Sequence, residues 1–128
     1  MKRTTVNGEL KKLSPRYFEI RGKKVYAYDK VNVFDETTIG VPGAKYQLVS
    51  FPPGASVAPH FHEKVREVFL IASGKGKITI NGKEHFTVAG DIFLIEPNDS
   101  HALQNTDSFP FIVHIFKWNE NAHDINWK

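Results

Sequence analysis

The chain has 128 residues, enough for one domain with a modest core, and its 41% hydrophobic and 24% charged residues exclude both a disordered chain and a membrane-embedded one. Cysteine is absent, which excludes disulfides and thiolate metal sites, so any metal needs His, Asp or Glu ligands. The net charge of +3 is concentrated in the first 30 residues, but no nucleic-acid-binding module accompanies it, and we expect no nucleic-acid partner.

The N-terminal region, residues 1–30, is predicted to be a basic arm or to form the first strands. Its first residues are basic, but no apolar segment of the kind that a secretory signal needs follows them. The apolar runs further along the chain are too short to cross a bilayer. We therefore expect a cytoplasmic protein with no membrane partner.

Short segments rich in Val, Ile, Phe and Tyr recur between Gly, Pro and Asn residues, a pattern typical of an all-β sandwich or barrel. Asn81 and Gly82 predict a hairpin turn, because both tolerate the positive φ angles that this turn requires. Pro52 and Pro59 disfavour a strand, so residues 51–61 are predicted to be a turn. The predicted strands are 17–20, 25–34, 45–51, 67–72, 75–81, 84–88, 91–95, 101–106 and 111–118.

Three histidines and one glutamate have the spacing of a metal site. His60 and His62 are separated by one residue, so on a strand they point to the same side of the sheet and can share one ion. Glu67 begins the next predicted strand, and His101 begins a later one after the turn 96–100. Each residue alone also suits an ordinary surface position. Together they suit one divalent iron, manganese, nickel, cobalt or zinc ion.

The spacing of these residues resembles that of the cupin superfamily. Its first motif, G-x5-HxH-x3,4-E-x6-G, is matched at Gly54, His60, His62, Glu67 and Gly74. Its second motif, G-x5-P-x-G-x2-H-x3-N, is matched at Gly90, His101 and Asn105, whereas Glu96 replaces the proline and Asn98 replaces the central glycine. Asn98 is a mild replacement, because asparagine adopts the left-handed conformation more readily than most residues with a side chain.

The resemblance covers residues 54–105 and implies an all-β fold, a cupin-type jelly-roll β-barrel. We expect one domain over residues 1–128, with the core barrel at 44–118 and a C-terminal tail at 119–128. The resemblance also implies that His60, His62, Glu67 and His101 bind the metal and that a small-molecule substrate enters the barrel mouth. It suggests a homodimer, in which strands 25–34 and 111–118 supply sheet edges that need cover.

The residues that share a strand face with the metal ligands predict the character of the pocket. Phe69 and Ile71 share the face of Glu67, and Leu103 and Asn105 share that of His101, so the lining is mostly apolar. An octahedral ion with four protein ligands keeps two positions for water, substrate or dioxygen. The apolar lining favours a dioxygenase-type enzyme, and the family's dioxygenases share this ligand set. A closed structural zinc site is the less favoured alternative.

Two other functions remain open from the sequence. The first is a redox-neutral isomerase, epimerase, lyase or decarboxylase acting on a sugar acid or hydroxy acid, with Tyr46, Gln47 and Glu96 as candidate acids or bases. This function requires cations inside the barrel, and Arg66 is predicted to point away from it. The second is a binding module without catalysis. His114 is predicted to be a hydrogen-bonded core residue.

Overall fold

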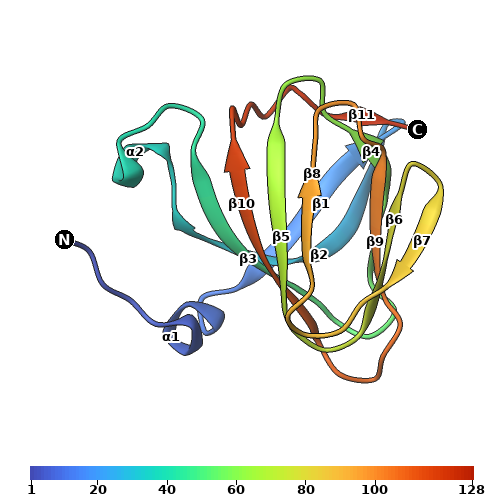
Figure 1. Cartoon of the computed structure of the whole chain (residues 1–128), viewed down its shortest axis with the longest axis horizontal. Helices are drawn as coiled ribbons and strands as arrows, with labels where there is room; N and C mark the ends of the chain where they lie inside the picture. The colour runs from blue at the N-terminus through green and yellow to red at the C-terminus, as the bar shows by residue number, and fades with distance from the viewer.

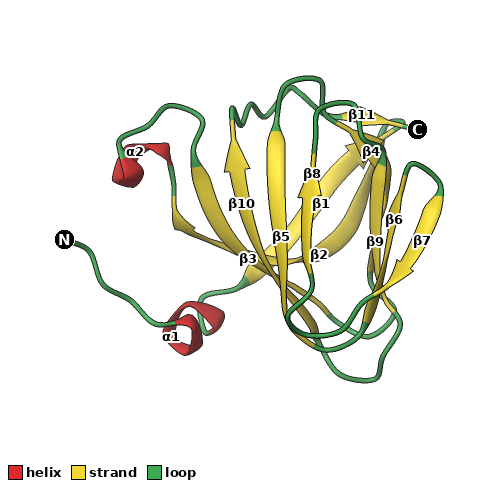
Figure 2. Ribbon diagram, in the orientation of Figure 1, coloured by secondary structure: helices red, strands yellow, loops and turns green.

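Two antiparallel β-sheets face each other and enclose the interior of a barrel (Figure 1, Figure 2). The structure is a computed structural model that describes all residues, 1–128. The larger sheet has the strand order β1 (Ser14–Ile20), β2 (Lys23–Phe34), β3 (Lys45–Phe51), β10 (Phe111–Trp118), β5 (Arg66–Ser73), β8 (Ile92–Ile95). The smaller sheet has the order β11 (Asn126–Trp127), β4 (Ser56–Phe61), β9 (His101–Asn105), β6 (Gly76–Ile80), β7 (Lys83–Phe86). This arrangement confirms the predicted jelly-roll fold.

The core lies between the two sheets and is formed by side chains that alternate along the strands. Phe51, Phe69, Ile78, Leu103 and Phe111 are nearly inaccessible to solvent and belong to one apolar cluster. Because burial of apolar area is the main stabilising contribution to folding, we expect this cluster to hold the barrel together without help from a metal.

Strand β4 is the main difference from the prediction, which placed a turn over residues 51–61. The turn ends at Ala55, whose N–H donates to the carbonyl of Pro52 at 2.9 Å. Pro59 is tolerated in the strand because the pairing of β4 with β9 is irregular between Val57 and His60, so its missing N–H interrupts no regular ladder. This irregularity places His60 directly opposite His101.

Strands β2 and β10 do not lie at sheet edges, so the prediction that they supply edges was wrong. Strand β10 pairs with β3 and β5, and β2 pairs with β1 and β3. The apolar run at 111–116 reflects a central strand whose second face is half-buried. The edges of the larger sheet are β1 and β8, and those of the smaller sheet are β11 and β7.

Two turns are confirmed in detail. Asn81 and Gly82 have φ angles of 51° and 81° and connect β6 to β7, as the hairpin prediction requires. Asn98 has a φ of 72°, so it adopts the conformation expected of the glycine that it replaces. Its N–H donates to the carbonyl of His62 at 2.7 Å, which ties this turn to the chain just after β4.

The short helices and the chain ends complete the fold. Helices α1 (Val6–Leu10) and α2 (Glu36–Ile39) were not predicted, and both lie at the side of the larger sheet (Figure 2). Neither helix has the length or apolar character needed to span a membrane. The last residues return to the barrel, where β11 pairs with β4.

Candidate metal centre

His60 and His62 are brought to the interior by β4, which ends at Phe61. Both side chains are buried, and their rings lie 5.3 Å apart between centroids. The alternation of side chains along the extended chain places both on the same side, as the His-x-His spacing predicts. Phe61, between them, is half-buried on the other side.

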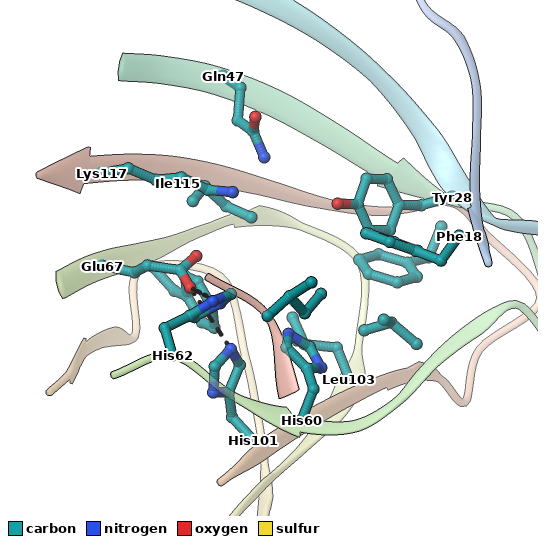
Figure 3. A pocket seen from close by; sticks show the side chains of 14 residues that line it. Phe18, Tyr28, Gln47, His60, His62, Glu67, His101, Leu103, Ile115 and Lys117 are labelled. Carbon is teal, nitrogen blue, oxygen red and sulfur yellow. Dashed lines mark ion pairs between the residues drawn. The ribbon is translucent and has the colours of Figure 1, made fainter. Parts of the chain in front are cut away.

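Glu67 and His101 approach the pair from two further strands, one in each sheet. The ring nitrogens available from His60, His62 and His101 all lie within 4.8 Å of one another. Glu67 Oε1 lies 2.9 Å from His62 Nε2 and 3.5 Å from His101 Nε2. Figure 3 shows the four side chains converging on one point in the pocket. The structure therefore brings together all four residues that the sequence singles out.

Each of the three imidazoles is oriented by a backbone carbonyl. His60 Nδ1 lies 2.8 Å from the carbonyl of Ala58, and His101 Nδ1 lies 3.0 Å from that of Asp99. His62 Nδ1 lies 2.5 Å from the carbonyl of Asp124. A carbonyl can only accept, so each Nδ1 donates and a neutral ring presents the lone pair of Nε2 to the cavity. This outer hydrogen bond is typical of metal-binding histidines.

Two buried polar atoms in this group have no hydrogen-bond partner. They are His62 Nε2 and Glu67 Oε1, which lie 2.9 Å apart. Because the proton of the neutral His62 ring is on Nδ1, both atoms are acceptors and cannot form a hydrogen bond with each other. Buried polar groups are rarely left unsatisfied, and those that are often mark a site for an ion or water. Three imidazole nitrogens and a carboxylate oxygen aimed at one point fit a divalent first-row metal ion.

The charges at the site are also those that a cation would require. Burial, with a contribution from His101, lowers the pKa of His60 to about 3, so this ring is neutral at ordinary pH. Burial opposes the ionisation of Glu67, but Lys117 and the two neighbouring histidines hold its pKa well below the ordinary value. The residues thus provide a neutral imidazole and an ionised carboxylate, as metal ligation requires.

Comparison with known proteins identifies the family. A family model described as a cupin domain matches residues 47–116, more than half of the chain. The chain belongs to the cupin family. This cupin is 38% identical over 61 residues to an oxalate-binding protein of Thermotoga maritima, a match that covers 48% of this chain and only 50% of that relative.

Solved structures share the fold of this cupin. One is a predicted oxalate decarboxylase from Thermotoga maritima, with a TM-score of 0.71, 24% identity, and coverage of 84% of this chain and 94% of the other. Another is an uncharacterized conserved protein with a double-stranded β-helix domain from Klebsiella pneumoniae, with a TM-score of 0.67, 22% identity, and coverage of 79% and 84%. At these identities the likeness shows the fold alone.

The cupin's pocket is apolar on one side and polar on the other. Its volume is about 50 Å³, and its apolar lining includes the predicted Phe69 and Leu103. Ile71 and Asn105 were also predicted to belong to the lining, and this was wrong: both are buried but do not line the pocket. Lys117 does line it and is the cross-strand neighbour of Glu67, so the barrel contains a cation that the sequence did not identify.

Of the candidate acids and bases, only Gln47 lines the pocket (Figure 3). Tyr46 lies on the outer face of β3, where its hydroxyl is 2.7 Å from His114 Nδ1. His114 is thus hydrogen-bonded as predicted, but it is half-buried rather than in the core. Glu96 is exposed beside Arg66 at 3.9 Å, and the exposure of Arg66 confirms that it points away from the cavity.

Asp124 in the C-terminal tail supports the candidate site and was not predicted from the sequence. Besides orienting His62 through its carbonyl, it accepts hydrogen bonds at its carboxylate from the N–H groups of Glu63, Lys64 and Val65, at 2.8 to 3.2 Å. Burial raises the pKa of Asp124, but these three bonds lower it below the ordinary value. The tail therefore fixes the turn between β4 and β5, which carries His62 and leads to Glu67.

Proposed function

We propose that the protein binds one divalent transition metal ion through His60, His62, Glu67 and His101, and that the ion holds a small organic acid. The observation that carries this proposal is the set of three oriented Nε2 atoms and an unpartnered Glu67 oxygen, all buried and directed at one point. A bound ion would polarise a ligand oxygen or lower the pKa of a bound water. The chain's own residues orient the ligands and exclude bulk water.

Lys117 favours an acidic ligand. Its strand position beside Glu67 places a cation in the lining of the pocket, and a carboxylate ligand needs such a countercharge. The relative from Thermotoga maritima, described as oxalate-binding, supports the same class of ligand. We therefore place the redox-neutral reaction of a small acid, of the lyase, decarboxylase or isomerase kind, ahead of the dioxygenase that the sequence favours.

The dioxygenase remains the second candidate because the opposite side of the pocket is apolar. Phe18, Tyr28, Phe51 and Leu103 line it, and the polar group among them, the Tyr28 hydroxyl, has its pKa raised by burial. An apolar aromatic or diketone substrate would suit these side chains. It would leave Lys117 without a partner.

Three measurements on the full chain test these functions. Elemental analysis should find about one metal ion per chain. Calorimetry should show oxalate binding to the metal-loaded protein and not to the metal-free protein. Oxygen uptake after iron loading should be absent with small acids. Oxygen uptake with an apolar diketone would favour the dioxygenase. Oxalate binding without turnover of any tested acid would favour a binding module. Absence of metal would overturn the proposal.

Metal affinity should depend on pH through His62. Burial alone would lower the pKa of His62, but Glu67 raises it above the ordinary 6.5. A protonated Nε2 cannot bind metal, so below this pKa the ion must displace a proton. We expect cobalt affinity to be constant above the His62 pKa and to fall by about tenfold or more per pH unit below it. Chelator competition, corrected for protonation of the chelator, measures this, and a flat profile contradicts it.

We also propose that the protein is a homodimer that pairs through the outer face of β5 and β8. Val68 lies beside Leu94 and Leu70 beside Ile92, and the two β8 side chains are 57% (Leu94) and 69% (Ile92) exposed. Such an apolar patch suits a two-fold contact with its own copy. Leu94→Lys should yield a monomer at micromolar concentration in light scattering, whereas Phe86→Lys, on an exposed residue of the other sheet, should not. A monomeric wild type would exclude the dimer.

A further inference from the structure

Four cationic side chains gather at the barrel mouth. Arg16, Lys30, Lys45 and Lys117 come from β1, β2, β3 and β10, which are neighbours in the larger sheet, and all four line one cavity of about 180 Å³. Each is half-buried, whereas nearly all other Lys and Arg residues of the chain are exposed. They are therefore not part of the ordinary solvated surface. We refer to these four residues as the cationic mouth.

Two side chains of the cationic mouth, those of Lys30 and Lys117, lie on strand faces that line the barrel interior. Lys30 follows Tyr28 by two residues, and Lys117 follows Ile115 by two, so each shares a strand face with a residue that lines the metal pocket. The pocket and the mouth cavity have Phe18, His62, Lys117 and Ile125 in common. The two cavities are thus adjacent, and Lys117 lines both.

The positive charge of the mouth is only partly balanced by the protein. Two carboxylates, Glu120 and Asp124, line the same cavity as the four cations. Lys45 pairs with Glu120 at 3.4 Å, and the Asp124 carboxylate is occupied by backbone N–H groups. Lys30 and Lys117 have no carboxylate within ion-pair distance.

The unpaired charge of Lys30 is unfavourable for the protein alone. Burial, followed by the charges of Lys45, Arg16 and Lys117, lowers the pKa of Lys30 to about 8. Half-buried cations that repel one another cost folding free energy, and a bound anion would remove that cost. Lysine ammonium groups on a concave surface bind carboxylate and phosphate oxygens through charge-assisted hydrogen bonds.

The metal pocket itself is too small for more than a few ligand atoms, because its volume is about 50 Å³. A longer ligand would extend into the mouth cavity, which shares four lining residues with the pocket. We propose that the cationic mouth is an anion subsite, and that the ligand is an organic acid that binds the metal at one end and carries a second carboxylate or phosphate at the other. This inference deepens the proposed function and rests on its metal centre for the position of the first end.

The test compares two pairs of probes that differ mainly in the second anionic group. The first pair is 2-oxoglutarate and 2-oxovalerate, and the second pair is 3-phosphoglycerate and glycerate. Calorimetry on the manganese-loaded full chain should show that at least one dianion binds about tenfold or more tightly than its monoanion. The pair with the larger ratio identifies carboxylate or phosphate as the preferred group.

Substitutions then assign the preference to the mouth. Lys30→Met should abolish the preference for the dianion and leave binding of the monoanion within about twofold, while Lys30→Arg should retain the preference. Lys117→Met should also abolish the preference, but it should weaken binding of the monoanion as well, because Lys117 lines the metal pocket too. Lys23→Met is the matched control, because Lys23 lies on the same strand as Lys30 but is exposed. It changes the net charge equally and should leave the preference intact. Metal content is measured for each variant, since Lys117 neighbours Glu67.

The outcomes separate this inference from the metal proposal. If the wild type binds metal and monoanions but does not prefer either dianion, the subsite is wrong and the metal centre stands. The subsite is also wrong if both Met variants keep the preference. If the protein binds no metal but still prefers a dianion in a manner that depends on Lys30, the subsite stands and the metal proposal fails.

Discussion

Replacing His62 or His101 with alanine should release the metal and leave the barrel folded. Each change removes one of four converging ligands, and the loss of affinity should exceed the roughly 10- to 100-fold that follows removal of an outer hydrogen-bond partner. The fold should persist because the apolar cluster between the sheets, and not the ion, contributes most of the stability. Elemental analysis after dialysis, combined with circular dichroism, measures both effects.

His114→Ala is the matched control for these two variants. It removes the same side chain from the same barrel, but His114 lies on the outer face of β10 and is hydrogen-bonded to Tyr46. Its metal content should equal that of the wild type. Unchanged metal in His62→Ala and His101→Ala would reject the ligand assignment, and equal loss in all three would indicate a general loss of structure.

The grouping of the four proposed metal ligands was predictable because it depends on local spacing. His60 and His62 share a side of the chain through the two-residue repeat of an extended strand, which needs no knowledge of the rest of the fold. Glu67 and His101 each lie at the start of a strand, and their approach followed from the family resemblance. Residues 51–61 were wrongly predicted to be a turn, but this did not affect the grouping of the histidines. His60 and His62 are two residues apart in an extended segment, so their side chains lie on the same side of the chain.

The cations at the mouth could not be predicted, because their position depends on long-range register. Lys117 neighbours Glu67 only through the pairing of β10 with β5, which are far apart in the sequence. The run 111–116 is apolar on both faces, so its pattern does not show which face is internal. For the same reason the buried strand β3 gave no basis for choosing between Tyr46 and Gln47. Asp124 lies in a polar tail that carries no periodic pattern at all.

Asn105→Ala should unfold the barrel more easily without removing the metal ligands. The Asn105 side chain is 2% exposed, and its amide nitrogen donates to the carbonyls of Phe51 and Phe109 at 2.7 and 2.9 Å. Its amide oxygen accepts from the N–H of Asp107 at 2.8 Å. Alanine removes three bonds and leaves a buried carbonyl unsatisfied, which should lower the free energy of unfolding by about 3 kcal/mol.

The test of Asn105 is urea unfolding of the metal-free protein, because a bound ion would add its own stabilisation. Gln104→Ala is the control: Gln104 is the preceding residue on β9, carries the same amide group and is exposed. Its loss should change the free energy of unfolding by less than about 0.5 kcal/mol. Equal midpoints for the two variants would contradict the structural role of Asn105. Folded Asn105→Ala should still bind about one metal ion, because the Asn105 side chain is hydrogen-bonded to none of the four proposed ligands. Within the second cupin motif, His101 is thus proposed to bind the metal, whereas Asn105 joins the strands around the site.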